Sequence, residues 1–279
     1  MKVATIRRCV LLVATLACGE ADATRRAKRD ATLHPCIAWQ LRELTRCATV
    51  TVPENRAIRG GRTIPLRVMV LPSRGTRLYR DPLVLLTGGP GMAATAMPGY
   101  ADGVFGPLRD GRDVVLIDVR GTGDSSPLEC GLYEDDGRLQ RFVDPSFPLG
   151  PVRACEARLA AAADLTQYST PILAQDLDDA RAALGLDSLN LFGVSYGSRL
   201  ALAYMRAFPA HVRSGVLQGI TPPESEVFQS TPLAAERAVA HGLQTCARDE
   251  FCHVASPDPR ADVMTLLAHL RERRATVRL

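Results

Sequence analysis

A serine between two glycines, in the run 193–197 (Gly-Val-Ser-Tyr-Gly), is the group in this chain best suited to covalent catalysis. The apolar run 189–192 before it predicts a short buried strand, and the run 198–208 after it predicts a helix. A serine on such a sharp strand-to-helix turn holds its hydroxyl above the sheet. Glycines are needed beside it because a Cβ there would collide with the neighbouring strand and helix. Ser195 is therefore the predicted nucleophile.

A second glycine cluster, in the run 87–91 (Thr-Gly-Gly-Pro-Gly), directly follows another predicted strand. Glycines let backbone N–H groups approach a reacting carbonyl, whose oxygen becomes negative during acyl transfer. Because proline has no N–H, the donor is Gly88, Gly89 or Gly91, of which we select Gly89. The N–H of Tyr196, immediately after the serine, is the expected second donor. Alone, such a cluster would more often be a plain turn; with the serine motif it predicts an oxyanion hole.

A third motif, Asp-Val-Arg-Gly-Thr-Gly-Asp-Ser-Ser at 118–126, follows the next predicted strand. Loops at the carboxyl ends of strands build ligand sites in open α/β sheets. A catalytic acid is one reading of this motif. The favoured reading is structural, with Asp118 and Arg120 tying the loop by ion pairs and backbone hydrogen bonds.

The elements that position these motifs predict an α/β fold. Two β-branched runs separated by a turn-rich segment predict an antiparallel hairpin, and the continuous apolar runs that follow are typical of a parallel sheet covered on both faces. Thr170 is the expected N-cap of a helix with Pro171 at its first position, and Gly185 ends that helix. The predicted strands, in chain order, are 47–52, 65–71, 83–87, 114–118, 189–192 and 214–217.

From residue 221 the pattern changes to two amphipathic helices, at 232–246 and 261–274, without a core strand between them. This predicts a helical cap inserted after the strand that follows the nucleophile helix. Residues 275–279 look like the start of a strand, so we expect the chain to stop inside a domain. The expected organisation is a signal peptide at 1–23, a lead segment at 24–46, a core at 47–220 and a cap at 221–279.

The first residues predict a secretory leader. Basic residues open the chain, an apolar run spans 9–17, and an Ala-x-Ala cleavage site lies at 21–23. The apolar run is far shorter than the ~20 residues that a membrane span requires. Lipid attachment at Cys18 is the alternative, less favoured because Thr15 stands where a lipoprotein site usually has Leu.

Six of the eight cysteines follow the leader and form local pairs. An even number in an exported chain suits disulfides in an oxidising compartment. Metal binding is the alternative, but no Cys-x2-Cys or Cys/His ligand spacing occurs. Proximity predicts the pairs Cys36 with Cys47, Cys130 with Cys155, and Cys246 with Cys252.

The net charge of +4 comes from the N-terminal residues. Residues 1–29 carry seven basic and two acidic side chains, so the remaining body has a net charge of −1. A nucleic-acid-binding protein should have a basic face in its folded part. The charge distribution therefore argues against nucleic acid as a partner.

Together, the three motifs resemble the α/β-hydrolase family of prolyl aminopeptidases, and within it the secreted bacterial tripeptidyl aminopeptidase branch. The resemblance covers roughly residues 36–279 and includes the closely spaced Cys246 and Cys252. It implies a Ser-Asp-His hydrolase that removes residues or short peptides from free N-termini and needs no metal or cofactor. Thr87 departs from the family, because prolyl aminopeptidases commonly have His there, and this favours the tripeptidyl branch.

The resemblance implies an acid and a histidine after late core strands, which this sequence does not show before Leu279. We expect both to belong to sequence beyond that residue, and the chain alone to be nearly inactive. None of the five histidines is favoured as the base: His34, His211, His241, His253 and His269. Cap carboxylates could bind a substrate ammonium, but solvated charges are the favoured reading of Glu224, Glu226 and Glu236.

The sequence thus predicts a secreted or periplasmic serine exopeptidase that acts through an acyl-enzyme on Ser195. An esterase or other small-molecule hydrolase is the alternative within the same class, because a fold does not fix a substrate. A non-catalytic binding protein, or an incomplete enzyme without acid and histidine, is the alternative from a different class. The expected partner is a peptide with a free N-terminus, and no stable membrane span is expected.

Overall fold

The computed structural model describes residues 31–132 and 147–272. The chain divides into two compact units, one that ends at Pro223 and one that begins at Glu224. The predicted leader and the predicted strand at 275–279 lie outside the described residues.

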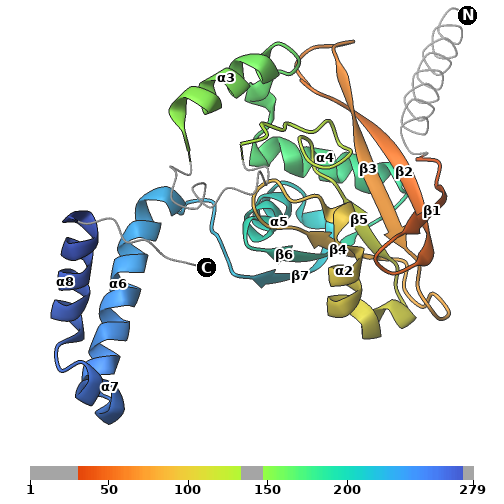
Figure 1. The fold of residues 1–279 in the computed structure, drawn as a ribbon. Helices are drawn as coiled ribbons and strands as arrows, with labels where there is room; N and C mark the ends of the chain where they lie inside the picture. Colours follow the sequence, from red (N-terminus) through yellow and green to blue (C-terminus); the bar gives the residue numbers. More distant parts are fainter. Residues whose placement is uncertain (1–30, 133–146, 273–279) are drawn as a thin grey trace, which may run out of the picture. The chain divides into compact units, whose positions relative to one another are not determined.

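The first unit is built on a seven-stranded mixed sheet with the order β1-β2-β3-β5-β4-β6-β7 (Figure 1). The pairs β1–β2, β2–β3 and β3–β5 are antiparallel, whereas β5, β4, β6 and β7 run parallel to one another. The predicted antiparallel hairpin and mostly parallel core are therefore confirmed. The strands are β1 His34–Ala38, β2 Glu43–Pro53, β3 Thr63–Leu71, β4 Leu83–Leu86, β5 Val114–Ile117, β6 Leu189–Val194 and β7 Val212–Gln218.

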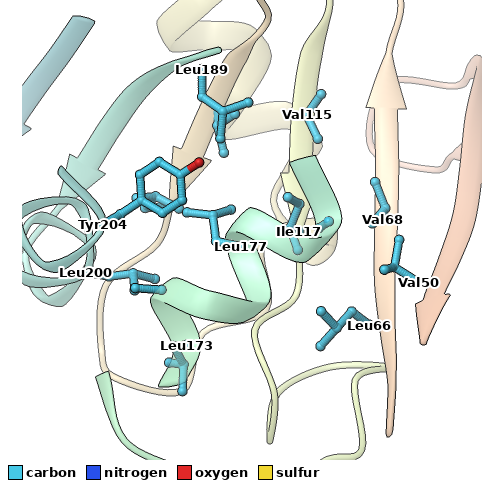
Figure 2. Packing of buried hydrophobic residues seen from close by; sticks show 14 of the residues in the cluster. Val50, Leu66, Val68, Val115, Ile117, Leu173, Leu177, Leu189, Leu200 and Tyr204 are labelled. Atoms are coloured by element: carbon cyan, nitrogen blue, oxygen red, sulfur yellow. The ribbon is translucent and has the colours of Figure 1, made fainter. Parts of the chain in front are cut away.

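Both faces of the central strands are buried, because successive side chains of a strand point to opposite faces. Val84 and Leu86 of β4 join a core with α4 (Thr170–Ala183) and α5 (Tyr196–Ala207). Leu83 and Leu85 point the other way, into a second core with α2 (Pro98–Phe105). Figure 2 shows the first core, where side chains of α4 and α5 gather beside those of β3 and β5. Helices on both faces were predicted and are confirmed.

Helix α4 begins one residue earlier than predicted, because Thr170 was expected as the N-cap and Pro171 as the first helical residue. Ser169 is the N-cap, Thr170 is the first helical residue and Pro171 the second. The carbonyl of Ser169 accepts the N–H groups of Ile172 and Leu173, which makes Ser169 the start of the helical hydrogen bonds. One further helix of this unit, α3, spans Leu149–Ala160.

Among the described strands, β7 lies at one edge of the sheet and β1 at the other, and most residues of β7 are exposed, with Val216 at 54%. This differs from β4 and β5, which are buried along their whole length.

The described residues of the second unit form three helices: α6 (Val227–Arg248), α7 (Glu250–Ala255) and α8 (Pro259–Glu272). The predicted helices 232–246 and 261–274 correspond to α6 and α8, whereas α7 was not predicted. Helix α6 begins five residues before Pro232, which lies inside it. Among the described residues, no helix is both long and apolar enough to cross a membrane.

All three predicted cysteine pairs form disulfides. They close short chain segments, with sequence separations of 11, 25 and 6 residues. The first joins β1 to β2, the second ties the segment after the 118–126 motif to α3, and the third joins α6 to α7. The bonds are Cys36–Cys47, Cys130–Cys155 and Cys246–Cys252.

Candidate active site

Ser195 lies on the turn between β6 and α5, where the sequence places it. Its backbone adopts φ 53° and ψ −119°, in a region that residues other than glycine rarely occupy. Such local strain persists only where the surroundings hold it, and it clusters at functional sites. The residue is exposed at the carboxyl end of the sheet. This is the geometry of a nucleophile presented above a strand-to-helix turn.

The two flanking glycines are required by close backbone contacts. A Cβ on Gly197 would lie 1.9 Å from the carbonyl oxygen of Leu86 in β4. A Cβ on Gly193 would lie 2.6 Å from the carbonyl oxygen of Gly197. The predicted collisions with the neighbouring strand and helix are therefore confirmed.

The loop 87–91 packs directly against the serine. A Cβ on Gly88 would lie 3.2 Å from the Cβ of Ser195 and 3.7 Å from its Oγ. The N–H of Gly89 belongs to the peptide group that directly follows Gly88. The expected donor therefore lies next to the residue that packs against the Ser195 side chain. Thr87 fixes the loop, because its Oγ1 donates to the carbonyl oxygen of Met92 at 2.6 Å.

The two expected oxyanion donors have no competing acceptor. Among the described residues, neither the N–H of Gly89 nor that of Tyr196 donates to a protein acceptor. The side chain of Tyr196 is fixed separately, by a 2.8 Å hydrogen bond between its hydroxyl and that of Thr170. Both N–H groups can therefore donate to the oxygen of a substrate carbonyl.

A second serine, Ser198, holds the elbow in place, and sequence reasoning missed it. Its buried hydroxyl donates to the carbonyl oxygen of Ser195 at 2.6 Å and accepts the N–H of Thr221 at 2.9 Å. The N–H of Ser195 donates to the carbonyl oxygen of Gln218 at 2.8 Å. The elbow is thus joined on both sides of Ser195 to the end of β7 and the loop after it.

Asp118 and Arg120 of the third motif are buried and have structural contacts. The carboxylate of Asp118 accepts the N–H and the hydroxyl of Thr95, at 2.8 and 2.7 Å. The guanidinium of Arg120 pairs with both oxygens of Asp176 in α4, at 2.5 and 2.7 Å, and donates to three backbone carbonyls. These contacts support the structural reading over a catalytic acid.

The partner Asp176 was not predicted, although the sequence carries a signal for it. It is followed by Leu177 and is spaced three residues from Leu173 and four from Ala180, so it lies on the apolar face of α4. A buried carboxylate requires a cation or hydrogen bonds. An acidic residue on an apolar helical face therefore indicates a partner such as Arg120.

His211 pairs with a carboxylate, but at the end of β7 that is remote from Ser195. Its Nδ1 lies 2.7 Å from Oδ1 of Asp178, which also accepts the hydroxyl of Tyr204 at 2.9 Å. His211 directly precedes β7, whereas Ser195 contacts Gln218 at the other end of that strand. Seven residues at ~3.3 Å each separate the two ends by roughly 20 Å. His211 is therefore not the base for Ser195.

The cluster around Asp178 shows shifted pKa values of structural origin. Burial alone would raise the pKa of Asp178, but hydrogen bonds from Arg181, Tyr204 and His211, with the charge of Arg181, lower it overall. Burial and the neighbouring Asp178 carboxylate raise the pKa of the Tyr204 hydroxyl. The carboxylate is therefore held ionised and the phenol neutral between α4 and α5.

Of the remaining histidines and the three glutamates, His34 alone belongs to the first unit by its sequence position. His34 is exposed on β1. The other residues of this group belong to the second unit: His241, His253, His269, Glu224, Glu226 and Glu236.

Comparison with known proteins agrees with this geometry. Tripeptidyl aminopeptidase from Streptomyces lividans is 33% identical over 224 residues, which are 73% of this chain and 41% of that protein. Serine protease Hip1 from Mycobacterium tuberculosis is 29% identical over 238 residues, covering 77% and 44% of the two chains. Carboxylesterase B from the same organism is 33% identical over 226 residues, covering 74% and 42%. The chain thus spans less than half the length of these relatives.

The predicted resemblance to tripeptidyl aminopeptidases is confirmed by these matches. A family model described as the alpha/beta hydrolase fold matches residues 81–276, which include all three motifs. Since that range is more than half of the sequence, the chain belongs to the alpha/beta hydrolase fold family.

Proposed function

We propose that this chain is the nucleophile-bearing part of a secreted serine exopeptidase that releases N-terminal residues or short peptides. The observation that carries the proposal is the exposed Ser195 in its positive-φ turn, with the glycine loop packed against it. Relatives named as a tripeptidyl aminopeptidase and a serine protease support peptide substrates. Three disulfides support an oxidising compartment.

In this mechanism, Oγ of Ser195 attacks the peptide carbonyl carbon and gives its proton to a base. The negative oxygen of the tetrahedral intermediate accepts hydrogen bonds from the N–H groups of Gly89 and Tyr196. Loss of one such donor typically raises the barrier by about 2.7–4 kcal/mol. The amine then leaves with a proton, and water hydrolyses the acyl-serine. Neither histidine of the first unit lies beside Ser195, so the proposal assigns the base to residues outside that unit.

A fluorophosphonate probe tests whether Ser195 is an activated nucleophile in the chain as it stands. Because the base is assigned outside the first unit, we expect slow labelling, equal in the parent protein and in Ser230→Ala, a control that changes an exposed serine of α6. Labelling should be lost in Ser195→Ala. Absence of labelling in the parent protein would contradict activation and favour an incomplete enzyme or a binding protein.

The substrate class requires a second comparison, because one relative is named a carboxylesterase. The informative pair is a tripeptidyl anilide with a free N-terminus and the same compound with an acetylated N-terminus. An exopeptidase hydrolyses the first and not the second. Turnover of a butyrate ester without turnover of either anilide would support the esterase instead.

A further inference from the structure

A cleft of about 570 Å³ opens in the first unit beside the nucleophile turn. This volume lies within the range of small-molecule sites, which are typically ~300–1,000 Å³. Residues from four parts of the chain line it: the glycine loop, the 118–126 motif with Leu128, the start of α4 with the residues before it, and Tyr196 of the nucleophile turn. The lining residues include Gly91, Val119, Leu128, Tyr168, Thr170 and Tyr196.

The cleft adjoins both oxyanion donors. Tyr196 lines it and carries one of the two proposed donors on its own backbone. Pro90 and Gly91 line it and directly follow Gly89, which carries the other donor. The 2.8 Å hydrogen bond between the hydroxyls of Tyr196 and Thr170 fixes one wall. A substrate carbonyl whose oxygen accepts from both donors therefore places one substituent of its carbon at the mouth of the cleft.

Much of the lining is apolar. Val119, Leu128 and Leu173 contribute aliphatic side chains, and Tyr168 contributes a ring. The hydroxyl of Tyr168 donates to Glu54 at 3.2 Å, so this polar group is satisfied within the protein. Burial and the charge of Glu54 raise the pKa of Tyr168, and its phenol is therefore neutral.

Electrostatics disfavours a cationic group in this cleft. Among the described residues that line it, none is Asp or Glu, and the one charged side chain is Arg120. The guanidinium of Arg120 is compensated by Asp176 and by carbonyl oxygens. A substrate ammonium here would lose water and find no carboxylate, which is unfavourable.

We propose that this cleft is the subsite for an uncharged, apolar side chain next to the scissile carbonyl, and that it excludes the substrate's terminal ammonium. This inference rests on the proposed function, because it uses the same nucleophile and oxyanion donors. The preferred substrates carry an aliphatic residue beside the cleaved bond. The free N-terminus is bound at another place.

Binding of N-acetyl-leucine methylamide, followed by NMR of isotope-labelled methyl groups, tests the subsite without requiring catalysis. We expect saturable shifts of the Val119, Leu128 and Leu173 methyl signals. The glycine analogue should bind at least about tenfold more weakly, since burial of an aliphatic side chain contributes roughly that much. Leucine amide, with a free ammonium, should bind no better than the acetylated compound. Equal binding of the leucine and glycine compounds would overturn the inference.

Two substitutions at Leu128 separate filling of the cleft from a change in its charge. Leu128→Trp fills the cleft, and we expect at least about tenfold weaker binding of N-acetyl-leucine methylamide. Leu128→Glu supplies a carboxylate, and we expect it to weaken the binding of N-acetyl-leucine methylamide and to allow the binding of butylammonium. Leu108→Trp, at an exposed leucine in another part of the unit, is the matched control and should bind as the parent does. Unchanged binding in folded Leu128→Trp and Leu128→Glu variants would overturn the proposal.

The two proposals fail in different ways. Fluorophosphonate labelling of Ser195 without leucine selectivity would leave the hydrolase proposal standing and remove the subsite. Leucine selectivity at the methyl signals without labelling would keep the subsite and remove the claim of an activated serine.

Discussion

Removal of the guanidinium of Arg120 should destabilise the first unit far more than removal of an exposed arginine. Arg120 is almost fully buried at 2% exposure and donates to Asp176, Glu54, Gln167 and Pro53. In Arg120→Leu, all of these acceptors lose a partner, and Asp176 becomes a buried carboxylate with one cation fewer. Breaking a buried pair from one side typically costs about 3–5 kcal/mol.

The surroundings of Asp176 place the expected value at the lower end of that range. Arg56 also contacts Asp176, at 2.7 Å, with its side chain 26% exposed. It partly compensates the charge that Arg120 leaves behind. We therefore expect a loss of about 3 kcal/mol in the free energy of unfolding. Arg120→Lys keeps the charge but cannot reproduce the two-point contact, so it should lie between the parent and Arg120→Leu.

Arg46→Leu is the matched control, because it makes the same change at a half-exposed arginine whose partner Asp113 is buried. Its side chain is 45% exposed, and Asp113 keeps Arg77 at 3.6 Å. Exposed pairs contribute about 0–1 kcal/mol, so the control should lose less than that. Urea unfolding followed by circular dichroism gives both values. Equal losses in Arg120→Leu and Arg46→Leu would refute the reasoning.

Two further predictions concern the elbow and the acid limb of stability. Gly197→Ala should lower the free energy of unfolding by more than about 3 kcal/mol and abolish the labelling of Ser195, because its Cβ meets the Leu86 carbonyl at 1.9 Å. Gly150→Ala, in α3 with open space around it, is the control and should be as stable as the parent in the same urea assay. Asp178 has a lowered pKa, so its contribution is complete above the unfolded value of about 3.9 and is lost as pH falls through the folded value. Asp178→Asn should therefore lose less stability than the parent between pH 7 and pH 3, and an unchanged acid limb would contradict this.

Much of the fold was predictable because the central strands are continuous apolar runs. Residues 83–86 and 114–117 are buried on both faces, and a pattern of that kind has few other interpretations. Strand β1 was not predicted because Pro35 interrupts a short segment without clear alternation. Its place at the edge of the sheet depends on pairing with β2 and on the disulfide from Cys36 to Cys47. The cysteine spacing predicted the disulfide, but nothing in the composition of residues 34–38 indicated a strand.

The candidate site divides in the same way. Ser195 and its glycines were predictable because their constraints are local: a tight turn requires glycine where backbones meet. Ser198 was not, because its role depends on the N–H of Thr221, on the far side of β7. The cleft beside Tyr196 was equally invisible, because its walls come from segments that only the fold brings together.

The dependence of the elbow on β7 has a consequence for when the nucleophile forms during folding. The N–H of Ser195 is held by Gln218, and its carbonyl is held by Ser198, which contacts Thr221. Gln218 and Thr221, which fix the serine N–H and the Ser198 hydroxyl, both follow Ser195 by more than twenty positions. When residues 193–197 have been synthesised and these later residues have not, the positive-φ conformation of Ser195 lacks the hydrogen bonds that hold it. A growing chain therefore presents Ser195 in its positive-φ conformation only after β7 has docked against β6.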